Sequence, residues 1–169
     1  MKIYLATDHA GFSLKEIVKD YLTGQGHNVE DCGAHALDHN DDFPDFISKA
    51  AEKISANPYD KAIIFGGSGQ AEMMLANKYP GVRAALFYSP KEAVGAVDVT
   101  GKTSTDPYEI IVLAREHNDA NILSLGARFL TDEEALEAVR IFLTTPFSKA
   151  ERHERRLAKI GRIEKELHE

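Results

Sequence analysis

The chain has 169 residues, and its 27 Asp and Glu outnumber 20 Lys and Arg, which gives a formal charge of −7. This length fits one domain with a sizeable core. A content of 43% hydrophobic and 28% charged residues is typical of a globular protein rather than a disordered or fibrous one. One cysteine excludes an internal disulfide framework and a cysteine-rich zinc module. The acidic balance argues against nucleic acid and anionic membranes as partners, because both attract basic surfaces.

The distribution of apolar residues argues against a membrane-spanning protein. No apolar run approaches the roughly 18 residues that a spanning helix needs. The first residues, MKIYLATDHAG, place an acid and a histidine where a signal peptide would need an apolar stretch. We therefore expect a soluble cytoplasmic protein.

Short apolar runs alternate with helical patterns along the chain. The runs predict buried strands over residues 2–7, 28–32, 61–65, 82–87 and 121–125. Apolar residues at three- and four-residue spacing predict helices over 14–22, 43–54 and 131–143. Pro44 opens the second helix with Asp42 as its cap, and Thr131 with Glu134 forms a capping box for the third. This alternation predicts a Rossmann-like α/β fold with a parallel, doubly wound sheet, which binds ligands at the carboxyl ends of its strands.

Two segments fall outside that alternation. Residues 95–109 are rich in Gly, Thr, Ser, Asp and Pro and predict a loop that splits a longer helical stretch. After Pro146, residues 147–168 predict a final helix with many charges and few apolar side chains. A helix this polar packs more readily across a subunit boundary than inside its own core. We expect one domain, residues 1–146, followed by a helical tail, residues 147–169, that reaches a partner subunit.

Two polar residues follow the first predicted strand. Asp8 and His9 would stand beside a helix N-terminus, where a carboxylate and an imidazole can manage protons and anions together. The alternative is that Asp8 only caps the helix and that His9 is a surface residue.

A glycine-rich turn, GGSGQAE over residues 66–72, follows the third predicted strand. Its backbone amides could converge on an anion, although it is not a Walker A loop and fits GxGxxG poorly. Glu72 would lie in the first turn of the next helix, where the helix dipole alone can explain an acid. The functional interpretation makes Glu72 a general base beside an amide-lined oxyanion site.

Polar and basic residues cluster again in the second half of the chain. Residues 114–121, AREHNDAN, lead into the last strand, and a solvated turn would also explain them. Arg128 follows that strand at the expected ligand edge. In the tail, Arg152 and Arg156 lie one helical turn apart, and residues 152–162 carry five Lys and Arg against one Glu, a local charge of +4. Arginine forks suit phosphate, although a solvated charged face would explain them as well.

Taken together and in this order, these motifs resemble the B-type ribose-5-phosphate isomerases and their relatives, the galactose-6-phosphate and allose-6-phosphate isomerases. The resemblance covers nearly the whole chain outside 95–109, and the matching segments are DHAGF at 8–12, DCG at 31–33, DDFPDF at 41–46, GGSGQAEMMLANK at 66–78, PGVRAAL at 80–86, AREHNDANILSLGAR at 114–128 and TTPFSKAERHERR at 144–156. It implies an open five-stranded parallel sheet with helices on both faces, and a homodimer or tetramer with shared active sites. It also implies an aldose–ketose isomerase that works without metal or nucleotide cofactor, through ring opening and a cis-enediolate.

The resemblance assigns catalytic roles residue by residue. His117 would assist ring opening, with Asp8 close to the ring-end oxygens of the sugar. Ser68 would hydrogen-bond near the same oxygens, and the enediolate would be stabilised by backbone amides of the turn, at Gly67, Gly69 and Ala71.

The resemblance also assigns the binding residues. His9 and Arg128 would contact the phosphate from one subunit, and a second group would reach it from the other subunit: Arg152, His153 and Arg156. Asn118 would bind sugar hydroxyls, and two residues would lie at the rim of the pocket, Asp42 and Phe43.

The proton-transferring base divides the family. Many members carry a cysteine at the first position of the turn and read CGTG, whereas a second branch reads GGSGNGE and uses the glutamate. Here that first position is Gly66, and the cysteine, Cys32, lies in another motif. The resemblance to the second branch makes Glu72 the base, and partial desolvation would raise its pKa. Two departures bear on the substrate: Gln70 and Ala71 replace NG, and the 95–109 loop is an insertion.

The leading hypothesis is the interconversion of ribose 5-phosphate and ribulose 5-phosphate. One alternative is a six-carbon substrate, such as allose or galactose 6-phosphate. Another is a sugar-phosphate sensor that has lost the chemistry. A nucleotide-binding Rossmann protein fits less well, because no acidic ribose anchor follows the first strand at the expected distance.

Overall fold

A computed structural model describes residues 1–168. The strands are β1 (Ile3–Thr7), β2 (Val29–Asp31), β3 (Lys61–Gly66), β4 (Ala84–Phe87) and β5 (Ile122–Gly126). They form one parallel sheet in the order β2-β1-β3-β5-β4. A short 3-10 turn, η1 (His9–Gly11), is followed by the helices α1 (Phe12–Gly24), α2 (Pro44–Ala56), α3 (Gln70–Ala76), α4 (Glu109–Asn118), α5 (Asp132–Thr144) and α6 (Glu151–His168). The predicted five-stranded α/β fold is confirmed.

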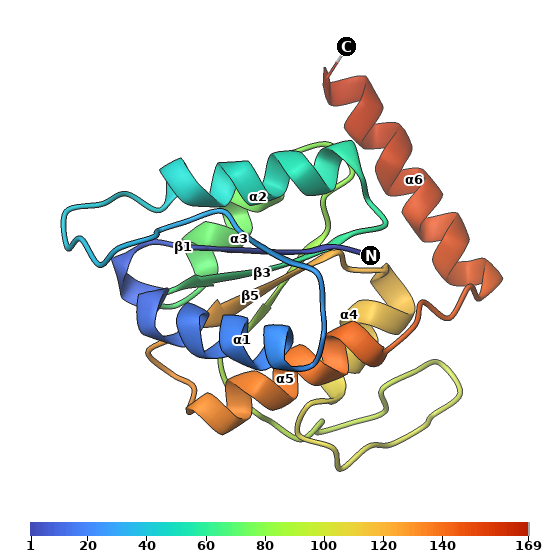
Figure 1. The fold of residues 1–169 in the computed structure, drawn as a ribbon. Coiled ribbons are helices and arrows are strands. Elements are labelled where there is room, and N and C mark those ends of the chain that lie inside the picture. The colour runs from blue at the N-terminus through green and yellow to red at the C-terminus, as the bar shows by residue number, and fades with distance from the viewer. Residues whose placement is uncertain (169) are drawn as a thin grey trace.

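Helices cover both faces of the sheet (Figure 1). Successive strand side chains point to opposite faces, so Ile3 and Leu5 pack with α1 and α5, whereas Tyr4 and Ala6 pack with α2. The residues of β1, β3 and β5 are buried on both faces, which explains why these strands read as continuous apolar runs.

The predicted elements lie within a few residues of the observed ones, and the capping box of α5 is present as predicted. Thr131 Oγ1 accepts the Glu134 amide at 3.2 Å, and Glu134 Oε2 accepts the Thr131 amide at 2.9 Å. The predicted cap of α2 is wrong. The capping residue is Phe43, which already has helical dihedrals, and Asp42 contributes only its carbonyl, 3.1 Å from the Asp45 amide.

The segment around 95–109 differs from prediction in one respect. Residues 88–108, all described by the structure, form neither helix nor strand, so the loop does not split a helix but joins β4 directly to α4. The final helix also begins later than predicted, at Glu151. Lys149 has φ of 53°, and the Ser148 amide donates to the Glu116 carbonyl at 3.1 Å, so the chain is tied to α4 before the helix starts.

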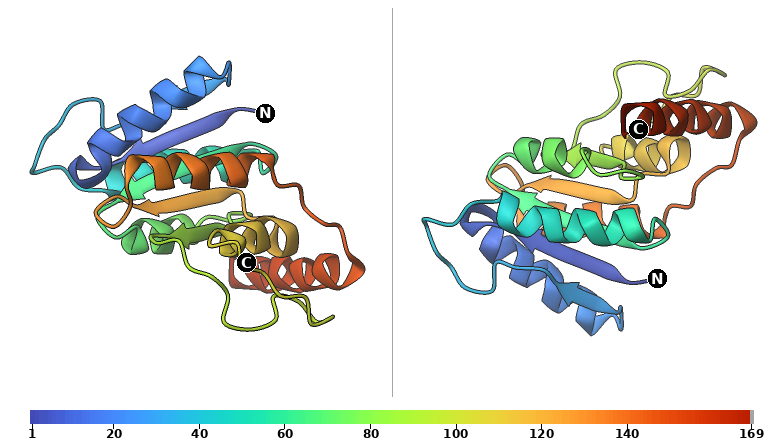
Figure 2. Two further views of the ribbon diagram at one scale, coloured as in Figure 1. Left: turned by 90° about the horizontal axis from the view of Figure 1, so that it is seen from below. Right: turned by 90° about the horizontal axis from the view of Figure 1, so that it is seen from above.

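The carboxyl ends of the strands lie at one edge of the sheet, and their amino ends lie at the opposite edge. The strands run in one direction, with α6 on the side away from their carboxyl ends (Figure 2). The last turn of α4 belongs to the amino-end edge, because the Asn118 carbonyl accepts a hydrogen bond from Arg83, the residue before β4, at 3.0 Å. Within residues 1–168, no helix combines the length and apolar character needed to cross a bilayer.

Candidate active site

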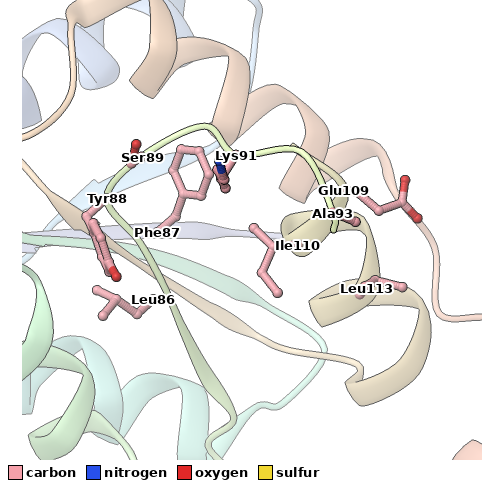
Figure 3. A pocket seen from close by; sticks show the side chains of 9 residues that line it. All are labelled: Leu86, Phe87, Tyr88, Ser89, Lys91, Ala93, Glu109, Ile110 and Leu113. Carbon is pink, nitrogen blue, oxygen red and sulfur yellow. The ribbon is translucent and has the colours of Figure 1, made fainter. Parts of the chain in front are cut away.

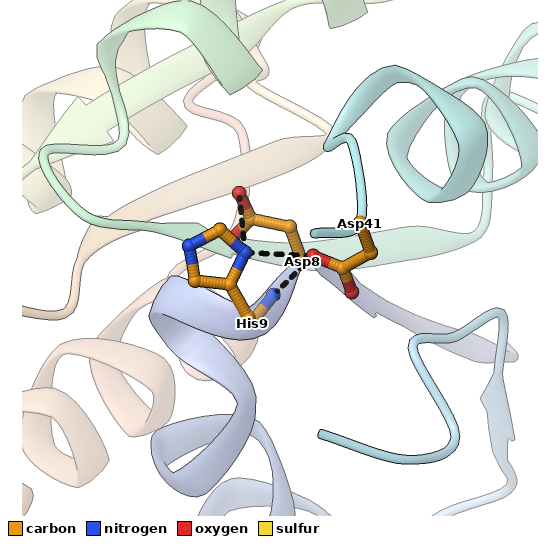
Figure 4. Close-up of side chains that lie close together, drawn as sticks. All are labelled: Asp8, His9 and Asp41. Carbon is orange, nitrogen blue, oxygen red and sulfur yellow. Dashed lines mark hydrogen bonds and ion pairs between the residues drawn. The ribbon is translucent and has the colours of Figure 1, made fainter. Parts of the chain in front are cut away.

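Asp8, His9 and Asp41 form a compact cluster at the carboxyl end of β1 (Figure 4). Asp41 Oδ1 lies 2.9 Å from the backbone nitrogen of His9 and 2.7 Å from its ring Nδ1. Asp8 caps η1 by accepting the Ala10 amide at 2.9 Å, and its other oxygen lies 4.0 Å from the His9 ring. Asp8 can therefore cap η1 with one carboxylate oxygen while the other oxygen faces the His9 ring.

Asp41 was missed by the sequence analysis, which placed the neighbouring Asp42 and Phe43 at the rim. The Asp42 side chain is exposed, and Phe43 packs against the core beneath α2. The hydrogen bond that His9 donates to Asp41 raises the pKa of His9, burial and Arg128 oppose this shift, and the charge of Asp8 adds to it. The DDFP motif indicated a site residue, but its sequence does not tell which of Asp41 and Asp42 faces inward.

The same three residues are the group that could hold a cation. One ligand atom from each of Asp8, His9 and Asp41 lies within 4.8 Å of the others. In the structure, however, His9 Nδ1 is already hydrogen-bonded to Asp41 Oδ1. The arrangement as it stands suits a charged imidazole rather than a metal ligand, since a metal would need that nitrogen free of its proton.

The glycine-rich turn leads from β3 to α3 beside the end of β5. The amides of Ala127 and Arg128 donate to the carbonyls of Gly66 and Gly67 at 2.8 and 3.1 Å, which fixes the turn to β5. Gly69 has φ of 73°, a conformation that favours glycine. A side chain at Gly67 would meet the Arg128 guanidinium, 3.2 Å from its Cζ. Arg128 therefore lies over the turn.

Glu72 is 5% exposed, and its carboxyl group lies against Gly66. A Cβ atom on residue 66 would overlap all three atoms of that carboxyl group. Burial raises the pKa of Glu72, a hydrogen bond from its own amide opposes the shift, and the negative charge of Asp8 adds to it. A buried carboxyl group with a raised pKa beside another acid has the properties of a general base.

The cysteine of the chain does not offer a second base. Cys32 follows β2, is buried and has no disulfide partner. Burial raises the pKa of its thiol to about 11, and the charge of Glu30 adds to the shift. The thiol is therefore protonated at neutral pH and is a poor proton acceptor.

A second, basic cluster joins the end of α4 to the start of α6. The rings of His117 and His153 lie 4.1 Å apart. His153 is 2% exposed; its Nε2 lies 2.9 Å from Arg152 Nε, which donates to it, and its Nδ1 lies 2.8 Å from Ser148 Oγ. Burial lowers the pKa of His153, and His117, Arg152 and Arg156 lower it further. A neutral His153 thus holds the Arg152 guanidinium in place.

The structure does not bring the two clusters together within one chain. Asp8, Glu72 and Arg128 lie at the carboxyl ends of the strands, whereas His117 and Asn118 precede the amino end of β5. The five residues of β5 separate the two edges by about 13 Å at a rise of about 3.3 Å per residue. Each chain therefore presents two incomplete halves of the predicted site.

An apolar surface borders the half-site that contains Glu72. A cavity of about 470 Å³ is lined by β4, the segment after it and α4 (Figure 3). Tyr88 in this lining is 49% exposed, and its ring lies 6.3 Å from that of Phe129, which is 62% exposed. Tyr88 also packs against Gly126, next to the glycine-rich turn. The apolar surface and the half-site are therefore adjacent.

Comparison with known proteins places this geometry in a family. The family described as Ribose/Galactose Isomerase matches residues 3–101 and 103–160. The chain is 41% identical over 165 residues to ribose-5-phosphate isomerase B of Mycolicibacterium paratuberculosis, covering 98% of this chain and 92% of that protein.

Solved structures agree with the sequence comparison. Ribose-5-phosphate isomerase B of Mycoplasma genitalium with bound ribulose 5-phosphate superimposes with a TM-score of 0.84 at 38% identity, covering 98% of this chain and 97% of that one. The Clostridium thermocellum enzyme gives a TM-score of 0.83 at 36% identity, covering 99% of both chains. Together with the strand order and the matched motifs, these likenesses show that the chain belongs to the Ribose/Galactose Isomerase family.

Proposed function

We propose that this chain is an aldose–ketose isomerase that interconverts ribose 5-phosphate and ribulose 5-phosphate. The observation that carries the proposal is the buried carboxyl group of Glu72, which fills the space beside Gly66 next to Asp8, in a member of this family. The solved Mycoplasma genitalium relative that binds ribulose 5-phosphate supports the choice of a five-carbon substrate.

Glu72 is the proposed base for the isomerisation itself. Its carboxylate removes the proton from C2 of the open-chain aldose, and the electron pair moves into a cis-enediolate. The amides of residues 67–71 and the Ser68 hydroxyl stabilise the negative oxygen. The hydroxyl proton on O2 moves to O1, and the protonated Glu72 returns its proton to C1, which leaves the C2 carbonyl of the ketose. The raised pKa of Glu72 suits both the acceptance and the return of this proton.

The phosphate anchor combines both clusters. His9, held as a donor by Asp41, and Arg128 would bind the phosphate from one chain, and Arg152 and Arg156 from another. The orientation of Arg152 by buried His153 pre-organises the guanidinium, so less entropy is lost on binding. A fixed phosphate would place C1 and C2 at Glu72.

The separation of the two clusters within one chain supports a shared active site. We infer that the chain works as a homodimer, or as a tetramer of such dimers, in which His117 and Asn118 of one subunit approach Asp8 and Glu72 of the other. The exposed apolar surface around Tyr88 and Phe129 supports this arrangement, because a partner that covers it also covers the adjacent half-site. In this assembly the polar helix α6 would contact the partner, and His117 would assist ring opening.

The test is an assay of ketose formation from ribose 5-phosphate by the wild-type chain and by Glu72→Gln. We expect the kcat of Glu72→Gln to fall at least about 100-fold, because general base catalysis contributes this much. Calorimetry should show that the variant still binds the sugar phosphate. Glu52→Gln, on the exposed face of α2, is the matched control and should retain full activity. Retained turnover in Glu72→Gln would remove this residue from its role, and wild-type binding without turnover would favour a sensor.

A further inference from the structure

The loop between β4 and α4 lines a cavity beside the basic cluster, and its residues 96–99 form one wall of that cavity. A cavity of about 240 Å³ is lined on one side by His117, Arg152, His153 and Arg156, and on the other by residues 96–99. The proposed phosphate ligands Arg152 and Arg156 therefore face this loop directly. None of the proposed site residues lies within residues 95–109, although the family match includes 95–101 and 103–109.

The tip of the loop is a defined turn rather than an open coil. The Val97 amide donates to the Lys102 carbonyl at 2.7 Å, which closes the turn. Asp98 Oδ1 accepts the Thr100 amide at 2.8 Å, the Thr100 hydroxyl at 2.7 Å and the Lys102 amide at 3.2 Å. The Asp98 carboxylate is thus held at the tip, in the lining of the cavity.

The chemistry of this wall opposes a phosphate. Three of its side chains, those of Ala96, Val97 and Val99, offer no hydrogen-bond donor. The fourth is the Asp98 carboxylate, whose charge is close enough to interact with Arg152. A sugar phosphate carries about −1.5 to −2 charges on its phosphate at neutral pH. A phosphate that moved from the arginines toward the loop would meet a like charge and an apolar surface.

We propose that residues 96–99 close the phosphate end of the substrate site and restrict the substrate to five carbons. The proposal rests on the proposed isomerase function and adds the determinant of substrate length. With C1 and C2 fixed at Glu72, one further carbon moves the phosphate outward by about 1.5 Å, the length of a carbon–carbon bond. In this proposal, the displaced phosphate approaches residues 96–99, which line the cavity opposite Arg152 and Arg156.

Two variants test the wall in different ways. Asp98→Asn removes the charge but keeps the Oδ1 acceptor that holds the turn. In the second variant, two glycines replace residues 98–101; the hydrogen bond between Val97 and Lys102 shows that the two ends are close enough for a two-residue turn. Val94→Ala is the control, because Val94 lies in the same segment and its side chain is 100% exposed.

The measurement is the ratio of kcat/KM for allose 6-phosphate to kcat/KM for ribose 5-phosphate. We expect the shortened loop to raise this ratio about tenfold, the usual cost of one extra methylene in a closed pocket. Asp98→Asn should raise it about threefold, as expected for one partly exposed charge, and Val94→Ala should leave it unchanged. An unchanged or lower ratio in the two loop variants would overturn the proposal.

Failure of the loop proposal can be distinguished from failure of the proposed isomerase function. If the wild-type chain turns over neither sugar, the isomerase proposal fails, and the wall is then tested by calorimetric binding of the same two sugar phosphates, which needs no turnover. Equal preference of the wild-type and loop variants in that binding experiment would also overturn it. If the shortened loop prevents folding, Asp98→Asn alone decides.

Discussion

The Glu72 carboxyl group occupies the space that a side chain at position 66 would fill. A residue larger than glycine at position 66 therefore displaces this carboxyl group. A Cβ at position 66 overlaps the Glu72 carboxyl group. A family member with a cysteine at this position therefore has no room for a glutamate carboxylate in the same place, which gives a steric reason for two alternative bases. The sequence resemblance predicts Glu72 as the base, whereas the overlap of its carboxyl group with a side chain at position 66 follows only from the structure.

Gly66→Ala should separate the position of the base from the rest of the site. The added methyl group displaces the flexible end of Glu72, so we expect kcat to fall at least about tenfold while the KM for ribose 5-phosphate changes little. Gly24→Ala is the control, because a Cβ there would contact nothing within 4 Å. Steady-state kinetics on both variants checks this, and an unchanged kcat in Gly66→Ala would contradict it.

Asp41→Asn should change the pH dependence of phosphate binding. The Asp41 hydrogen bond raises the pKa of His9, so the imidazolium persists to higher pH in the wild type. Asp8 and Asp41 both face His9, and Arg128 opposes them. Without the Asp41 charge, His9 should lose its proton at lower pH, and the KM for ribose 5-phosphate should rise at pH 8 more than at pH 6.

The complete pH profile of kcat/KM decides this prediction. The alkaline limb should move to lower pH in Asp41→Asn, whereas the exposed Asp42→Asn should leave it in place. An equal shift in both variants would show that Asp41 has no special part in holding the charge of His9.

At the scale of elements, buried Lys15 holds the chain that follows β2. Lys15 lies on α1 and is 0% exposed; its Nζ donates to Asp31 Oδ2 at 2.6 Å and to the Ala34 carbonyl at 2.7 Å. Lys19 reaches the same Asp31 oxygen at 3.1 Å from the surface. The segment after β2 leads to Asp41, so we expect the Lys15 hydrogen bonds to help position Asp41 beside His9.

The two lysines make a matched pair for a stability measurement. We expect Lys15→Met to lower the free energy of unfolding by about 2 kcal/mol, because it removes hydrogen bonds from a buried charged group. Lys19→Met should cost no more than about 1 kcal/mol, as is usual for a surface ion pair. Urea unfolding of both variants checks this, and equal losses would contradict the assigned role of Lys15.

Regular elements were predictable from the sequence because burial imposes periodicity on them. The strands were predicted to within two residues at each end, and the Thr131 capping box has a local sequence signature. The cap of α2 and the start of α6 were not predictable in this way. The cap depends on the helical dihedrals of Phe43, and the start of α6 depends on the hydrogen bond between Ser148 and α4. Contacts between distant segments leave no local pattern.

The acidic net charge of the molecule conceals a basic cluster at one edge of the sheet. Asp8, Asp41 and Glu72 gather at the carboxyl ends of the strands, whereas Arg152 and Arg156 lie at the opposite edge. In the proposed dimer, two chains pair these edges, and each chain supplies the residues that the other lacks at its site. The sequence contained the residues of both half-sites, but their separation by the length of β5 follows only from the fold.

Mixing two inactive variants tests whether one active site uses Glu72 of one chain and His117 of another. Glu72→Gln and His117→Ala chains are unfolded together, refolded and assayed with ribose 5-phosphate, with differential tags to count mixed dimers. Half of a random mixture is mixed dimers with one intact site each, so roughly a quarter of wild-type activity should return. Mixed dimers that form without regaining activity would contradict the shared site.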